Sequence, residues 1–497
     1  MSVASFLNKI GANRQLALSL VFLLFGALHL HISLVDHYLY KTNCFDFGVY
    51  NFAFRDFAHF RISPCPLYHW EGDVTFLQDH FSLTLPLLSP LYWVMNPIFG
   101  TYSLLILQWL FVMFGGYATY KLILFKSHNF NLALSAVLVY FTIYCRFAAH
   151  NADCNLVIMG SAMVPVFYYF FEKRKIVPLI ILFVFLILNR EDVSLGIFFF
   201  CLMLFVIHRK NGRQRNLALY LALASAAAFI IMFAVIIPAV ENPQRPYSLF
   251  NYAALGKTPK DAFFYVLSHP LETIKLLYTN TTGDPYFDGI KSKFYIVFFL
   301  SGGFMLLYRP VYLIALIPLV AKKMFNDDPV RWNVESYQGT EIASILPCFV
   351  FLTLNEIKPE TIRRVLTTFV CIMTLEVTLY YMYRTHETYY GVNRSNVFSE
   401  DLYKMSDDVR IIRKIVETFP DDASICTSGH ITPHLAFRDN IRIFPGYANA
   451  RYIFLEKHGS VFPITQELFD SELEKLRKNG QWVTIYDYPG VILLRRR

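Results

Sequence analysis

The chain has 497 residues, of which 55% are hydrophobic, 17% aromatic and only 16% charged, and its mean hydropathy is +0.39. Soluble domains of ordinary composition are far less apolar, so the sequence predicts a polytopic membrane protein that contacts the lipid bilayer. The formal net charge is +8, but the basic residues lie in short gaps between apolar segments. That placement is typical of membrane orientation signals and argues against a nucleic-acid partner.

The first apolar segment covers residues 15–35, which is enough to cross a hydrocarbon core about 30 Å thick. It follows Lys9 and Arg14, and no small-residue cleavage site comes after it. We therefore expect an uncleaved signal anchor with a cytoplasmic N-terminus.

The first outer loop, residues 36–101, opens with "TNCFDFGVYNFAFRDF", which sets Asp46, Arg55 and Asp56 among aromatic side chains. Two interpretations of Asp46 stay open at this stage. In the first, Asp46 caps an amphipathic helix at the membrane interface. In the second, it is a general base, flanked by aromatic residues that exclude water and raise its pKa.

Later in this loop, "DHFS" places Asp79 beside His80. Either His80 only bonds a backbone carbonyl, or the pair positions an acceptor or a divalent cation. The next segment, residues 83–93, contains two prolines and is too short to cross, which favours a re-entrant or interfacial helix. Cys44 and Cys65 share the loop, and the sequence leaves open whether they form a disulfide or stay free.

Ten further spans follow, near residues 102–124, 131–149, 156–171, 176–189, 193–208, 216–240, 293–308, 310–321, 341–355 and 364–383. The Lys- and Arg-rich gaps between them are short and are expected to stay in the cytoplasm. Eleven crossings in all place the C-terminus outside. The predicted fold is thus a mainly α, polytopic helical bundle over residues 1–383.

Charged side chains gather at the predicted outer ends of the spans, and charges beside a bilayer cost a few kcal/mol, so they usually serve a site. They are Asp46, Arg55 and Asp56, then Asp73, Asp79 and His80, then Arg146, His150 and Asp153, then Arg190, Glu191 and Asp192, and finally Lys322, Lys323 and Arg331.

Among these, the "NRED" turn holds Arg190, Glu191 and Asp192 between two short apolar segments, which predicts either a polar interface or a loop of solvated charges. Arg190 and Arg331 are the preferred phosphate ligands, because guanidinium forks match phosphate oxygens.

Familiar site motifs do not occur: the sequence has no P-loop, no GxGxxG after a strand, no HExxH and no GxSxG. Its eight cysteines show no CxxC or Cys/His metal spacing, so no zinc or iron–sulfur site is expected. Any chemistry must come from scattered loop residues.

Residues 384–497 have the composition of a soluble domain. A helical period over residues 401–419 ends at Pro420, "ASICTS", "IRIFP" and "RYIFLE" read as strands, and "TQELFDSELEKLRKNG" reads as a helix. The last segment predicts a hairpin that turns at Pro489 and Gly490. Together these elements predict a small extracytoplasmic α/β domain.

Several short motifs, "FDFGVYN", "DHFSLTLPLLSPLYWV", "LLILQWL", "ESYQGTEIASILPCFVF" and "PHLAFRDNIRIFPG", are similar to those of an uncharacterised predicted-membrane-protein family. The resemblance covers most of residues 15–460, and that family is itself related to the GT-C glycosyltransferases.

A GT-C relationship implies transfer of a hexose or pentose from a polyprenyl-phosphate donor at the outer face of a bacterial inner membrane, in cell-envelope synthesis. It also implies an acidic catalytic base in the first outer loop, a role that falls on Asp46. The second acidic residue of the wider class would be Asp79, Glu191 or Asp192, and the resemblance does not select among them.

We therefore expect a lipid-linked-sugar-dependent transferase. Its catalytic candidates are Asp46, Asp79 and Glu191, and its substrate-binding candidates are His80, Arg190, Asp192, His150 and Arg331. The alternative is a transporter or flippase for a lipid or polysaccharide precursor, which should show broken helices with charges near mid-span. An assembly scaffold whose C-terminal part docks a partner is a third interpretation.

Overall fold

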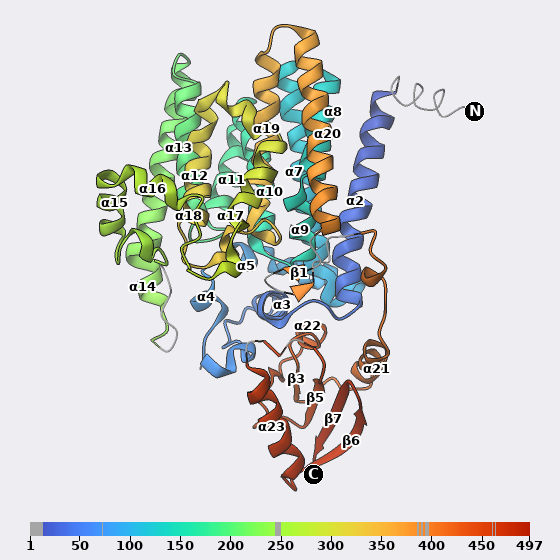
Figure 1. The fold of residues 1–497 in the computed structure, drawn as a ribbon. Coiled ribbons are helices and arrows are strands. Elements are labelled where there is room, and N and C mark those ends of the chain that lie inside the picture. The colour runs from blue at the N-terminus through green and yellow to red at the C-terminus, as the bar shows by residue number, and fades with distance from the viewer. Residues whose placement is uncertain are drawn as a thin grey trace, which may run out of the picture.

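The computed structural model describes residues 13–71, 73–243, 250–384, 387–388, 391–392, 397–459, 461–462 and 464–497. A bundle of long helices forms one part of the molecule, and a small sheet with its helices lies beyond one end of the bundle (Figure 1). The polypeptide between α2 and α7 lies at the junction of the two parts.

The main helices of the bundle are α2 (Arg14–Tyr38), α7 (Ser103–Ser127), α8 (Phe130–Thr142), α9 (Tyr144–Asn151), α10 (Leu156–Glu172), α11 (Ile176–Ile187), α12 (Val193–Ile207), α13 (Gly212–Ile231), α17 (Ile290–Leu300), α18 (Leu313–Met324), α19 (Thr340–Glu356) and α20 (Glu360–Arg384). Shorter helices are α3 (Val49–Ala58), α4 (Phe76–Asp79), α5 (Thr84–Leu88), α6 (Tyr92–Phe99), α14 (Ile237–Val240), α15 (Pro259–Ser268) and α16 (Pro270–Leu276).

Five helical stretches in the described part of the chain are long and apolar enough to cross a membrane. They are Arg14–Tyr38, Thr84–Ser127, Gly212–Val240, Tyr337–Glu356 and Glu360–Tyr383, and a sixth is obtained if α8 and α9, bent by 43°, count as one. The predicted eleven spans are not confirmed. Helices α10, α11 and α12 are apolar but have only 17, 12 and 15 residues, fewer than the roughly 20 that a crossing needs.

The proline-containing segment 83–93 contains α5 and the start of α6, and by length and composition it belongs to one apolar helical stretch, Thr84–Ser127, that ends with α7. Gly100, at φ +53°, interrupts the regular helix between α6 and α7. That the segment is re-entrant or interfacial stays a prediction.

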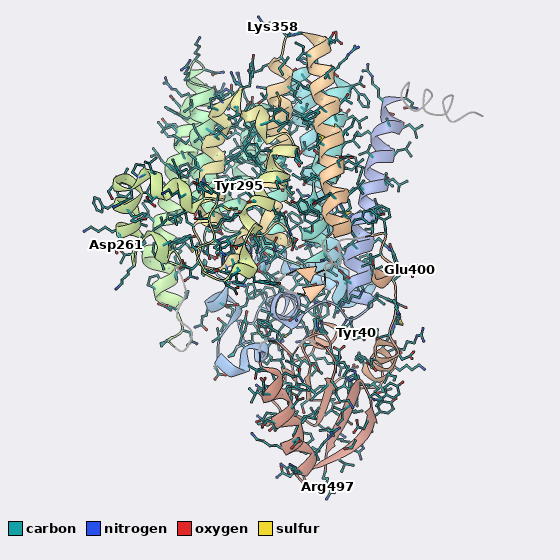
Figure 2. All side chains as sticks on the ribbon, viewed as in Figure 1. Tyr40, Asp261, Tyr295, Lys358, Glu400 and Arg497 are labelled. Carbon is teal, nitrogen blue, oxygen red and sulfur yellow. The ribbon has the colours of Figure 1, made fainter. Side chains whose placement is uncertain are left out.

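The predicted cytoplasmic loops meet at one end of the bundle. Lys126 at the end of α7 forms an ion pair with Glu172 at the end of α10 (2.8 Å), and His208 after α12 contacts the same carboxylate (3.0 Å). The Asn355 side chain donates to the Lys126 carbonyl (3.5 Å). Figure 2 shows Lys358 at this end, far from Tyr40 and Arg497, so the basic loops share one side as the charge pattern predicts.

Close packing inside the bundle depends on a glycine of α7. A Cβ atom at Gly115 would overlap the Ala162 carbonyl oxygen of α10 and the Tyr140 hydroxyl of α8. The backbones of α7 and α10 approach so closely because no side chain separates them, a common device in membrane helix packing.

We expect Gly115→Ala to destabilise the protein by about 1–3 kcal/mol, because the added methyl group must push two helices apart. The matched control is Gly196→Ala in α12, where the nearest atom to a new Cβ is 3.8 Å away and the alanine should be neutral or slightly stabilising. Thermal unfolding of both variants in one detergent measures the difference. Equal stabilities would contradict the packing argument.

The C-terminal elements are β1 (Glu387–Thr388), β2 (Gly391–Val392), α21 (Asp407–Val416), β3 (Ile425–Thr427), α22 (Thr432–Leu435), β4 (Ile441–Ile443), β5 (Tyr452–Glu456), α23 (Gln466–Lys478), β6 (Trp482–Tyr488) and β7 (Val491–Arg496). The larger sheet has the order β4-β3-β5-β7-β6. Strand β3 is parallel to β4 and β5, and β7 is antiparallel to β5 and β6. The predicted strands, the α23 helix and the terminal hairpin are all present.

The two faces of this sheet have different partners. Strand β5 shows the alternation that a pleated strand requires: Phe454 lies in a hydrophobic cluster with the aromatic residues of α3. Ile453 and Leu455 point the other way and pack with Phe469 of α23. The sheet therefore covers part of the loop of residues 36–101 with one face and is itself covered by α23 on the other.

Polar contacts fix the sheet to that loop. Asp439 accepts hydrogen bonds from both ends of the Arg55 guanidinium (2.6 and 3.1 Å) and from Arg61 (2.8 Å). The His434 ring of α22 stacks on the His37 ring of α2, with centroids 3.9 Å apart. Two distant parts of the chain are thus held as one unit around α3.

Candidate functional site

Asp46 lies in a short π-helical turn, Cys44–Gly48, that leads directly into α3. The cap of this turn is Asn43, whose side-chain oxygen accepts a hydrogen bond from the Phe45 amide (3.1 Å). The Asn43 amide in turn donates to the Asp153 carboxylate (2.8 Å). The predicted capping role of Asp46 is wrong, because Asp46 is the third residue of the turn and Asn43 occupies the capping position.

The helix that follows is not an interfacial one. In α3, every residue except Arg55 is buried, since the bundle lies against one side and the C-terminal sheet against the other. The Asp46 turn is therefore held by packing on both sides.

Burial raises the pKa of the Asp46 carboxyl from 3.8 to about 6. The nearby charges of His80 and Arg190 oppose that shift, and Asp79 adds to it. Asp46 nonetheless keeps some accessible surface. It is a carboxylate at neutral pH with a proton affinity well suited to a general base.

Asp79 and His80 lie within electrostatic reach of Asp46. The Tyr68 hydroxyl donates a hydrogen bond to Asp79, and His80 Nε2 is 3.6 Å from the same carboxylate. The His80 ring lies 6.0 Å from the Tyr50 ring, centroid to centroid. The "DHFS" pair therefore faces the Asp46 turn.

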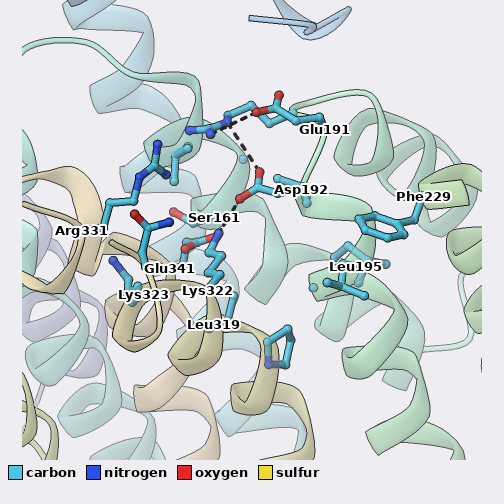
Figure 3. Close-up of a pocket in the computed structure, with 18 of the residues that line it drawn as sticks. Ser161, Glu191, Asp192, Leu195, Phe229, Leu319, Lys322, Lys323, Arg331 and Glu341 are labelled. Carbon is cyan, nitrogen blue, oxygen red and sulfur yellow. Dashed lines mark hydrogen bonds and ion pairs between the residues drawn. The ribbon is translucent and has the colours of Figure 1, made fainter. Parts of the chain in front are cut away.

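Asp46, Asp79 and His80 do not line the nearby cavity of about 630 Å³, part of which is shown in Figure 3. Arg190, whose charge acts on Asp46, does line it. One part of its wall is charged and comes from the "NRED" turn, α18 and the start of α19; another part is apolar and comes from α12, α13 and α18. The charged and polar residues that line it include Ser161, Arg190, Glu191, Asp192, Lys322, Lys323, Asn326, Arg331, Gln338 and Glu341; the apolar ones include Leu195, Ile197, Phe229, Phe233, Pro318 and Leu319.

A chain of alternating charges runs along the cavity wall (Figure 3). Arg190 contacts Glu191 (3.3 Å) and Asp192 (3.5 Å). Lys322 then joins Asp192 (2.7 Å) to Glu341 (2.6 Å). The "NRED" triplet is therefore part of a cavity wall and not a loop of solvated charges.

These contacts set the electrostatics of the "NRED" turn. Burial alone would raise the pKa of the Asp192 carboxyl, but Lys322 and Arg190 outweigh that effect and hold the pKa well below its usual range. Asp192 is consequently a permanent anion that links two cations.

Two other predicted binding residues have different positions. Arg331 lines the cavity, with its Nε 3.9 Å from Asp328. His150 does not line it. Its ring stacks on His29 of α2, with centroids 4.7 Å apart, and its Nδ1 lies 3.2 Å from the Ser33 hydroxyl. His150 is therefore a packing residue between α2 and α9.

Two tyrosines near Asp46 were not expected from the sequence. The charges of Asp46 and Arg190 both act on Tyr50 of α3 and on Tyr337, which precedes α19. Tyr337 belongs to the "ESYQG" motif and Tyr50 to "FDFGVYN", so membership of these motifs could have indicated a position near the site. An aromatic residue in an apolar sequence, however, is more simply interpreted as part of the hydrophobic core.

Cys44 and Cys65 are buried free thiols, so the disulfide alternative is not realised. Burial raises the pKa of both thiols. Within the described ranges, no group of three His, Cys, Asp or Glu side chains gathers in a way that could hold a metal ion.

Comparison with known proteins gives the family. No curated protein matches the chain. A family model described as "Predicted membrane protein (DUF2079)" matches residues 36–493, which include the Asp46 turn, the charged cavity wall and the C-terminal sheet. The chain therefore belongs to the DUF2079 family of predicted membrane proteins.

Proposed function

We propose that the protein transfers a sugar from a polyprenyl-phosphate donor to an acceptor hydroxyl, with Asp46 as the general base. The observation that carries the proposal is the position of Asp46. A half-buried carboxyl with a pKa of about 6 lies within electrostatic reach of Arg190, which lines a cavity that is charged on one side and apolar on another. An amphipathic phosphate ligand has matching chemistry at its two ends.

The apolar wall suits a lipid chain. Leu195 of α12, Phe229 of α13 and Leu319 of α18 line this part of the cavity, and Figure 3 shows Leu195 and Phe229 on the side away from Arg331. Apolar walls with a few convergent polar groups are the usual construction of small-molecule sites.

The reaction needs only the groups that are present. The acceptor oxygen forms a bond to the anomeric carbon, the bond from that carbon to the phosphate oxygen breaks, and the acceptor proton passes to Asp46. The polyprenyl phosphate leaves with the bonding electrons, and guanidinium groups stabilise its charge. Arg190 and Arg331 line the cavity and supply that charge.

Among the acidic candidates for a second role, Asp79 fits best. Glu191 is engaged by Arg190, and Asp192 by Lys322, so both are already neutralised by cations. Asp79 instead accepts from the Tyr68 hydroxyl and acts on Asp46. We assign Asp79 to positioning the acceptor, and Glu191 and Asp192 to holding Arg190 and Lys322.

We further propose that the protein lies in a bacterial inner membrane with its C-terminal sheet outside. The basic loops meet at one end of the bundle, and Figure 1 shows α3, which follows the Asp46 turn, and the sheet at the other end. Because short basic loops stay in the cytoplasm, this arrangement supports a position of the proposed site on the outer face.

The test uses the purified full chain in liposomes that contain polyprenyl-phosphate hexoses or pentoses, with a cell-envelope extract as acceptor. Release of free polyprenyl phosphate, measured by mass spectrometry, is the expected result. A parallel assay follows a fluorescent polyprenyl-phosphate lipid between leaflets. Lipid movement with no release of polyprenyl phosphate from any donor would refute the proposal and support the transporter.

A further inference from the structure

Lys323 is a buried amine on the cavity wall. Its exposed fraction is 2%, it lines the cavity, and its Nζ has no hydrogen-bond partner in the described part of the chain. Another buried lysine shows the usual alternative: Lys291 donates to the carbonyl oxygens of Leu276 and Met324 (2.6 and 2.7 Å). An unpartnered buried donor is rare and calls for an explanation.

The carboxylates along the cavity wall pair with cations other than Lys323. Glu191, Asp192 and Glu341 are taken by Arg190 and Lys322. Arg331 contacts only the half-exposed Asp328, at 3.9 Å among the described residues, so it retains unused donors. Figure 3 shows Lys323 and Arg331 on the same side of the cavity.

We propose that Lys323 joins Arg331 in binding a phosphate group, on the part of the cavity wall outside the ion pairs of Arg190. The ammonium would act as a compact point charge and the guanidinium as a fork, which together suit a tetrahedral anion. Asn326 and Gln338 line the same cavity and can supply neutral donors. The anion could be a lipid phosphate or free phosphate, and only the first source rests on the proposed function.

Burial lowers the pKa of Lys323 to about 7. The groups facing it are Glu341 and Cys145, which oppose the shift, and Lys322 and Arg331, which add to it. In the empty site the amine is therefore partly neutral at physiological pH. A bound anion favours the charged form, so binding should take up a proton.

The experiment measures binding of two probes, inorganic phosphate and decyl phosphate, to the full-length protein in detergent by titration calorimetry. Repeating the titration at pH 7.5 in two buffers of different ionisation enthalpy reports proton uptake. We expect saturable binding with proton uptake, a loss of affinity of about tenfold or more in Lys323→Met, and retained binding in Lys323→Arg. Lys358→Met makes the same change in net charge at an exposed position and should bind normally.

The outcomes separate the alternatives. Binding of decyl phosphate alone identifies a lipid headgroup as the source, and binding of both probes identifies a general phosphate site. Unchanged affinity in Lys323→Met, or equal losses in Lys323→Met and Lys358→Met, would overturn the site. Phosphate binding by a protein that transfers no sugar would leave the site intact and refute the transferase alone.

Discussion

Asp46→Asn is expected to reduce sugar transfer by about 10²–10⁴-fold while making the protein more resistant to unfolding. The transfer rate falls because an amide cannot take the acceptor proton, and general bases typically contribute rate factors of this size. The stability rises because burial of the Asp46 carboxylate is unfavourable, as its raised pKa shows. Initial transfer rates and thermal unfolding, measured on one preparation, test both halves.

Both the contribution of Asp46 to stability and the rate of transfer should depend on pH. In the folded protein the pKa of Asp46 is about 6, against 3.8 for an unburied aspartate. The folded state therefore binds the proton more tightly, and the stability from this group is present below pH 4 and is lost as the pH rises through 6. The loss is about 3 kcal/mol, at roughly 1.4 kcal/mol per pKa unit. Transfer should rise over the same range, since the base is then ionised.

Asp56→Asn, in helix α3 that follows the Asp46 turn, is the matched control. Asp56 is buried, but it accepts hydrogen bonds from the Ser63 amide and hydroxyl and contacts Arg61 at 3.0 Å. Its replacement should destabilise the protein with little effect on transfer. Asp46→Asn with wild-type turnover would exclude Asp46 as the base.

Asp192→Asn should have the largest effect on stability, a loss of about 3 kcal/mol at neutral pH. Asp192 is the anion between Arg190 and Lys322, whose side chains with its own are 15–26% exposed, and removing one member of such a largely buried ionic network leaves uncompensated charges. Thermal or denaturant unfolding in detergent measures the change. The contrasting variant is Asp328→Asn, whose half-exposed carboxylate lies 3.9 Å from Arg331 and should contribute less than about 1 kcal/mol.

The sign of the pH effect is opposite to that of Asp46. The pKa of Asp192 is lower in the folded state than in the unfolded chain. Its stabilising contribution is therefore fully present above pH 4 and is lost as the pH falls through the folded-state pKa. The difference between wild type and Asp192→Asn should shrink on acidification. Equal stability losses in Asp192→Asn and Asp328→Asn would contradict the ionic network.

Local sequence pattern predicted some elements well and others poorly. Strands β3, β4 and β5, helix α23 and the terminal hairpin follow from short apolar runs and turn residues, which are local signals. The span count did not follow, because α10, α11 and α12 are as apolar as spanning helices but shorter than a bilayer requires.

For the site, charged residues at predicted span ends were only a partial guide. Asp46, Asp79 and Arg190 do lie close enough to act on one another, but His150, also at a predicted span end, packs on His29. Contacts between segments far apart in the chain decide between these outcomes, and a local sequence pattern does not contain them. Likewise, no local pattern could show that Lys322 would be paired, whereas its neighbour Lys323 has no hydrogen-bond partner among the residues that the structure describes.

The C-terminal sheet that packs against α3 is synthesised long after α3 itself. The His430 ring contacts the Thr42 carbonyl (Nδ1 to O, 3.1 Å), two residues that are 388 positions apart. Ribosomes add roughly 5–20 residues per second, so the aromatic residues of α3 must wait for tens of seconds after their synthesis before the sheet reaches them. During that interval the nascent loop exposes a large apolar surface, and partitioning into the lipid headgroup region, or a chaperone, is needed to keep it from aggregating.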